Sequence, residues 1–111
     1  MESKKIKKVG VVLRPSTPQL KDSFYKLQKI FLKYGIEVNI DSISGAMIGI
    51  MGMEFELLCQ NSDALVTLGG DGTLISVVRR SFRYEIPVFG VYAGSLGFLA
   101  DINLDEFDSF V

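Results

Sequence analysis

The chain has 111 residues, 48% hydrophobic and 23% charged, which fits one globular domain. Its longest apolar stretch, residues 45–53, is much shorter than the roughly 20 residues of a membrane span, so the sequence argues against a membrane protein. Without histidine and with one cysteine, it excludes a Ser-His-Asp triad, a disulfide and a thiolate zinc cluster. A net charge of −1 argues against nucleic-acid binding. The early lysines precede no signal-peptide core, so we expect a cytoplasmic protein.

The first half of the chain predicts a strand, a helix and a second strand. Residues 9–13 are continuously apolar, which is typical of a strand buried on both faces, and two prolines follow it. Large apolar side chains then recur at helical spacing over residues 20–34, and Gly35 is the expected helix stop. The predicted inner face consists of Leu20, Phe24, Leu27, Ile30, Phe31 and Tyr34, with lysines mostly outward. Residues 36–43 form the second predicted strand.

The second half alternates again between strands and helices. Residues 45–52 are either a tight apolar loop or a helix start, leading into a helix over residues 53–59. A third buried strand is expected at residues 64–68, a sharp turn at 69–72 and a helix at 73–82. The inward residues predicted for that helix are Leu74, Val77, Val78 and Phe82. Residues 87–92 are the fourth predicted strand.

This alternation predicts a three-layer, doubly wound α/β fold with a mostly parallel sheet, of flavodoxin-like or Rossmann-like topology. Ligands of such sheets bind at the carboxyl ends of the strands. Two glycine-rich loops, residues 69–72 and 93–99, follow the third and fourth predicted strands. We therefore expect both loops to lie at the ligand-binding edge.

The run GGDGT at residues 69–73 is the most informative motif. Its glycines allow a ligand to approach the backbone closely, and the helix that follows directs free N–H groups towards an anion. Asp71 in this setting is a candidate general base. The plainer interpretation makes Asp71 a helix N-cap, but a cap needs neither the flanking glycines nor a second glycine-rich loop. A P-loop ending and a dinucleotide fingerprint after the first strand are both missing.

Together, the motif at residues 69–73 and the run GSLGFL at residues 94–99 resemble the amino-terminal domain of NAD kinases. The first motif is also similar to one in diacylglycerol and sphingosine kinases, whereas the second points to NAD kinase. The resemblance spans essentially the whole chain. It implies transfer of the γ-phosphoryl of ATP to the 2′-hydroxyl of the adenosine ribose of NAD, which gives NADP.

The resemblance also implies roles for individual residues. Asp71 matches the catalytic proton acceptor, and Mg²⁺ would accompany ATP. The residues that would bind NAD or ATP are Gly70, Asp71, Gly72, Thr73, Phe98 and Leu99. No metal ligand is assigned in the chain itself. Tyr92 is a departure, because the family usually has asparagine at that position.

Length is a second departure from the family. NAD kinases of this type have a β-rich domain after this one, so we interpret residues 1–111 as the amino-terminal α/β domain and expect it to be inactive alone. The resemblance further implies a homo-oligomeric full-length enzyme. A lipid kinase of the diacylglycerol type and a non-catalytic flavodoxin-like binding module are the alternatives. Cys59 is expected to be a buried small hydrophobe, and Arg79 and Arg80 to lie on a solvated helix face.

Overall fold

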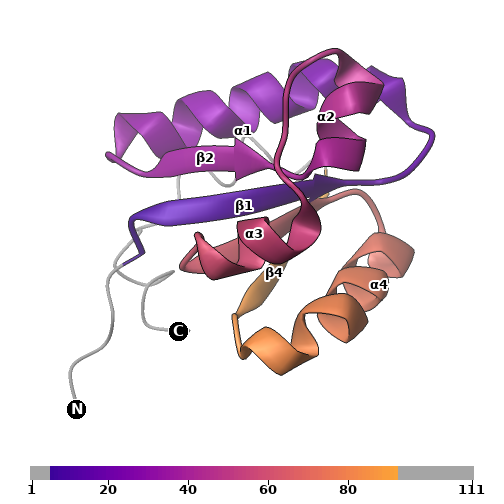
Figure 1. Ribbon diagram of the computed structural model, residues 1–111. Coiled ribbons are helices and arrows are strands. Elements are labelled where there is room, and N and C mark those ends of the chain that lie inside the picture. The colour runs from indigo at the N-terminus through magenta and orange to yellow at the C-terminus, as the bar shows by residue number, and fades with distance from the viewer. Residues whose placement is uncertain (1–5, 93–111) are drawn as a thin grey trace.

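Strands and helices alternate along residues 6–92, the part of the chain that the computed structural model describes (Figure 1). The elements are β1 (Lys8–Leu13), η1 (Pro18–Leu20), α1 (Lys21–Lys33), β2 (Glu37–Ile40), α2 (Ser42–Ile48), α3 (Phe55–Gln60), β3 (Ala64–Leu68), α4 (Asp71–Ser81), η2 (Phe82–Tyr84) and β4 (Val88–Val91). None of the helices within these residues has the length and apolar character required to cross a bilayer.

The four strands form one parallel sheet in the order β2-β1-β3-β4. The chain winds outward from β1 to β2, then crosses back over β1 to β3 and continues to β4, which confirms the predicted doubly wound topology. The winding direction changes between β1 and β3, whose register pairs Leu13 with Leu68. In open sheets, this switch point opens a crevice at the carboxyl ends of the strands.

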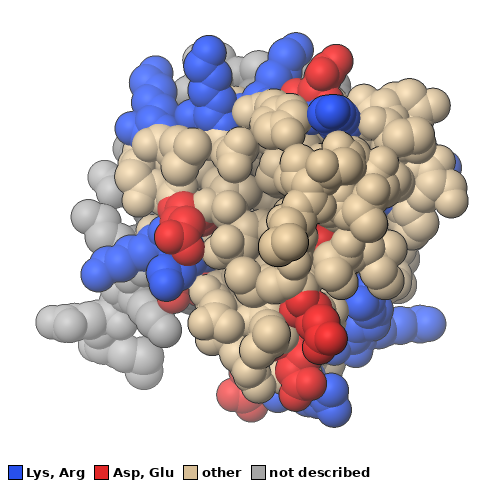
Figure 2. All heavy atoms as spheres, turned by 45° about the horizontal axis from the view of Figure 1, so that its top comes forward, with Lys and Arg blue, Asp and Glu red and all other residues tan. Residues whose placement is uncertain are grey.

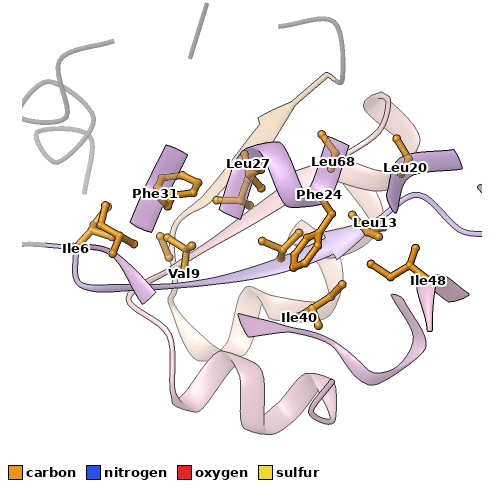
Figure 3. Close-up of a cluster of buried hydrophobic side chains, with 14 residues drawn as sticks. Ile6, Val9, Leu13, Leu20, Phe24, Leu27, Phe31, Ile40, Ile48 and Leu68 are labelled. Carbon is orange, nitrogen blue, oxygen red and sulfur yellow. The ribbon is translucent and has the colours of Figure 1, made fainter. Parts of the chain in front are cut away.

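Helices cover both faces of the sheet, and each face has its own apolar cluster. On one face, Phe24, Leu27 and Phe31 of α1 project onto the strands, as Figure 3 shows. On the other face, Leu58 of α3 and Val77 of α4 pack against the sheet. Burying each of these side chains stabilises the fold by about 1.5–3 kcal/mol before entropy costs. This arrangement gives the predicted three layers.

The predicted amphipathic helix is confirmed as α1, with one exception on its inner face. Tyr34 is 44% exposed because it lies after the last residue of α1, where the chain turns at Gly35. The lysines of α1 are exposed as expected, and Figure 2 shows basic side chains gathered along its top edge, over this helix.

The second strand is shorter than the predicted range of residues 36–43. It ends at Ile40, and Ile43 lies instead in α2, where its side chain is 71% exposed. The helix forms here because the Asp41 side chain caps it by accepting a hydrogen bond from the Ser44 N–H. Gly49, with φ of 81°, then ends α2, so residues 45–52 are divided between a helix and a turn.

The helix predicted at residues 73–82 begins two residues earlier, at Asp71, and its inner face differs from the prediction. Val77 is buried as expected, but Val78 is 43% exposed and Phe82 is 80% exposed. The buried positions are Thr73, Val77 and Ser81, spaced four residues apart. The Ser81 hydroxyl donates to the Val77 carbonyl, which satisfies the hydroxyl inside the apolar layer.

Candidate functional site

The carboxyl ends of β1, β3 and β4 meet at one edge of the sheet. The N–H of Arg14, directly after β1, donates to the Leu68 carbonyl over 2.9 Å. The N–H of Gly69, directly after β3, donates to the Val91 carbonyl over 3.1 Å. These bonds fix the first residue of the GGDGT motif between its two neighbouring strands. The motif therefore lies at the carboxyl ends of the strands, as predicted from the sequence.

The glycines of the motif have different surroundings. A Cβ at Gly69 would lie 2.8 Å from the Cβ of Arg14 and 3.0 Å from the Thr73 hydroxyl, so the turn itself requires glycine there. Among residues 6–92, nothing would lie within 4 Å of a Cβ added at Gly70 or Gly72. This part of the chain therefore leaves space at the two positions that a ligand can enter.

Asp71 is the first residue of α4 and is exposed. The N-cap residue is Gly70, so the alternative interpretation, in which Asp71 is the N-cap, is wrong. Instead, the Asp71 carboxylate accepts a hydrogen bond at Oδ1 from the hydroxyl of Tyr92. This hydrogen bond, followed by burial and by the carboxylate charge, raises the pKa of Tyr92 above its ordinary value.

A cavity of about 350 Å³ lies beside the motif, between the end of β1 and the inner face of α4. Two other surface cavities, of about 380 and 390 Å³, are as large, so volume does not single this one out. Its position does, because it lies at the β1–β3 switch point and includes Gly72 and Thr73 in its wall. Arg14 and Arg80 also line it, and no carboxylate is among its described lining residues, so its charge suits an anion.

Of the two arginines that line the cavity, only Arg80 is the subject of a prediction from the sequence. Arg80 is exposed on α4 as expected, and its guanidinium also lies 4.0 Å from the ring centroid of Phe55. Arg14 was not singled out, although it directly follows a strand and so had to lie at the ligand edge. The contact of Tyr92 was also missed, because only its departure from the family was visible in the sequence.

The remaining predicted residues are distributed as follows. Gly70, Asp71, Gly72 and Thr73 lie together at the start of α4, with Thr73 buried. Phe98 and Leu99, with the rest of the second glycine-rich loop, lie outside the described residues. Cys59 is buried as expected, and burial raises its pKa despite the opposing charges of Arg80 and Arg83.

Nothing in residues 6–92 gathers three or more of the side chains that commonly hold metals. Mg²⁺ often keeps most of its ligands from water and substrate phosphates and takes one or two carboxylates from the protein. Asp71, the carboxylate of the motif, could supply at most one such ligand.

The chain is similar over most or all of its length to proteins of one family. The family model of the ATP-NAD kinase N-terminal domain matches residues 9–111. The chain is 60% identical, over its whole length, to a protein of Sulfurimonas denitrificans named NAD kinase, and covers 39% of that relative. It is 57% identical over 106 residues to the NAD kinase of Wolinella succinogenes and 38% identical over 110 residues to that of Campylobacter jejuni, covering 96% and 99% of this chain. It spans 37% and 38% of those two relatives.

Proposed function

Because the chain belongs to the ATP-NAD kinase family, we propose that its site transfers the γ-phosphoryl of ATP to the 2′-hydroxyl of the adenosine ribose of NAD. The product is NADP. The observation that carries this proposal is an exposed carboxylate, Asp71, at the start of α4 and beside an arginine-lined cavity at the switch point of the sheet. That arrangement combines a proton acceptor with a place for phosphates.

In the proposed reaction, the Asp71 carboxylate accepts the proton of the ribose hydroxyl as its oxygen attacks the γ-phosphorus. The bond between that phosphorus and the bridging oxygen of ATP breaks, and ADP leaves with the bond's electrons. The proton is then lost from the Asp71 carboxyl to solvent. An exposed side chain suits this role, since it has to meet the substrate and later release the proton.

The phosphates of the nucleotides require compensating positive charge. We assign this role to Arg14 and Arg80, which line the cavity, and to the N–H groups of the first turn of α4. Mg²⁺ bound to ATP would supply further charge compensation. Gly70 and Gly72, where no described residue would meet an added Cβ, allow the nucleotide to approach the backbone.

The chain spans 37–39% of the length of these curated relatives, so the activity proposed here is that of the whole enzyme. We expect the rest of that length to contribute a second, carboxy-terminal domain and much of the nucleotide pocket. The homo-oligomeric state and the cytoplasmic location stay predictions.

Replacing Asp71 by asparagine in the complete gene product tests the proposal. We expect kcat for NADP formation to fall about 10²- to 10⁴-fold, the usual contribution of a general base. The matched control is Asp22→Asn, which makes the same change in the first turn of α1, on the opposite layer. The control should keep full activity, and an active Asp71→Asn enzyme would remove the proposed base.

A lipid kinase of the diacylglycerol type is the second candidate that the GGDGT motif allows. The run at residues 94–99, which favours NAD kinase, lies outside the described residues, but the relatives named NAD kinase favour the same substrate. Offering the complete gene product both NAD and a diacylglycerol in vesicles separates the two. Phosphorylation of the lipid alone would exclude the NAD kinase assignment.

A further inference from the structure

The hydrogen bond between Tyr92 and Asp71 joins two rigid elements at the site. Asp71 begins α4, whereas Tyr92 is the first residue after β4. The register pairs Val91 with Leu68, so the chain leaves β4 beside the end of β3 and opposite the start of α4. The two side chains are 21 residues apart in sequence but are placed by neighbouring strands.

The contact engages one side of the carboxylate. Tyr92 donates to Oδ1, and a carboxylate has a second oxygen that can accept another hydroxyl. A carboxylate at an exposed helix terminus is otherwise free to rotate about its Cα–Cβ and Cβ–Cγ bonds. Holding Oδ1 restricts that rotation and fixes where Oδ2 lies.

We propose that Tyr92 is a positioning residue, whose hydroxyl holds Oδ1 of Asp71 so that Oδ2 faces the hydroxyl to be phosphorylated. This inference rests on the proposed function of Asp71 and adds a specific partner for it. The same contact raises the pKa of Tyr92, because the Asp71 carboxylate stabilises the protonated phenol over the phenolate.

Tyr92→Phe in the complete gene product removes the hydroxyl and keeps the ring. We expect kcat to fall roughly 10- to 100-fold, because misplacing a reacting group by about 1 Å has effects of that size. KM for NAD should change less than about 2-fold, since the aromatic ring is retained. Tyr25→Phe is the matched control, because that tyrosine lies on α1, is 40% exposed, and should be dispensable.

A double-mutant cycle separates positioning from a general structural effect. If Tyr92 acts through Asp71, the Asp71→Asn/Tyr92→Phe enzyme should be no less active than Asp71→Asn alone. Losses that multiply would overturn the proposal, as would a Tyr92→Phe enzyme with unchanged or increased kcat. Increased activity would mean that the phenol competes with the substrate for Asp71. An active Asp71→Asn enzyme would instead remove the proposed function itself.

A second measurement needs no activity. In the 111-residue chain, Asp71→Asn should lower the pKa of Tyr92 towards its ordinary value, because the amide lacks the charge that disfavours the phenolate. The ionisation of Tyr92 can be followed by NMR of ring-labelled tyrosine, with Tyr92→Phe assigning the signal among four tyrosines. An unchanged titration would show that the contact does not form in solution.

Discussion

At the scale of single residues, the GGDGT motif combines glycines that serve different purposes. Gly69 is required by its own turn, since a side chain there would collide with Arg14 and Thr73. Gly72 lies inside the first turn of α4, where nothing described lies within 4 Å of an added Cβ. The described part of the fold therefore gives no steric reason for glycine at position 72, and close approach of a ligand is the role that we propose for it.

Alanine at the two positions should separate these purposes. Gly69→Ala should lower the free energy of unfolding by about 1–3 kcal/mol, the usual cost of forcing an extra carbon into a packed site. Gly72→Ala should raise it by up to about 1 kcal/mol, because alanine is the better helix residue. Urea denaturation of the 111-residue chain measures both values.

The same Gly72→Ala change should weaken substrate binding in the complete gene product. An added methyl group where the nucleotide meets the backbone should raise KM for NAD by about 10-fold or more, equivalent to about 1.4 kcal/mol. A variant that is more stable and fully active would show that no ligand approaches Gly72.

The sequence predicted the place of Asp71 but not its partner. A motif directly after a buried strand has to lie at the carboxyl edge of the sheet, so the position of Asp71 followed from the chain order alone. Whether a tyrosine 21 residues later reaches that carboxylate depends on the register of β3 with β4 and on a side-chain torsion. Neither quantity is encoded in a local pattern.

At the scale of elements, apolar side chains in and just after α4 differ sharply in burial. Val77, on the inner face of α4, is 1% exposed, whereas Phe82, the first residue after α4, is 80% exposed. Val77→Ala should therefore cost about 1–3 kcal/mol of stability, the sum of lost burial and a small cavity. Phe82→Gln should change stability by less than about 0.5 kcal/mol. Thermal or urea unfolding of the two variants checks this assignment, and similar losses for both would contradict it.

Two elements show why sequence periodicity failed locally. Ile43 is predicted to lie in a strand, and residues 45–52 in either a tight apolar loop or a helix start, yet α2 already begins at Ser42 because its N-terminus is fixed from outside the helix. The Asp41 side chain caps it, and the Ser44 hydroxyl accepts the N–H of Leu13 from β1. In α4, the apolar residues surround much of the helix, so the choice of inner face depends on the sheet it covers.

At the scale of the whole molecule, chain order predicted the architecture well. Continuous apolar runs of five residues identified β1 and β3, which are the central strands and are buried on both faces. The amphipathic pattern of α1 identified the helix that covers one face. The opposite layer, where α3 and α4 pack, was harder to predict from the sequence, because its helices are short or apolar on several sides.

The layer formed by α3 and α4 contains Cys59, the chain's only cysteine, so the packing of this layer can be measured through the reactivity of the thiol. Cys59 is 5% exposed on α3, so a thiol reagent can reach it only when α3 leaves the sheet or the domain unfolds. In the 111-residue chain at pH 7.5, we expect labelling by an aromatic disulfide to be at least about 100-fold slower than in urea. Comparable rates in the two solutions would mean that this layer is not packed.

Cys59 also makes the stability of the domain depend on pH. Because burial raises its pKa in the folded state, the folded chain keeps the thiol proton at pH values where the unfolded chain has lost it. The stabilisation is complete below the unfolded pKa of about 8.5 and is lost as pH rises through the folded value. The free energy of unfolding should therefore fall more steeply above about pH 8.5 for the native sequence than for Cys59→Ala. Parallel pH profiles for the two chains would show that the thiol is solvated, and that α3 does not close over the sheet as described.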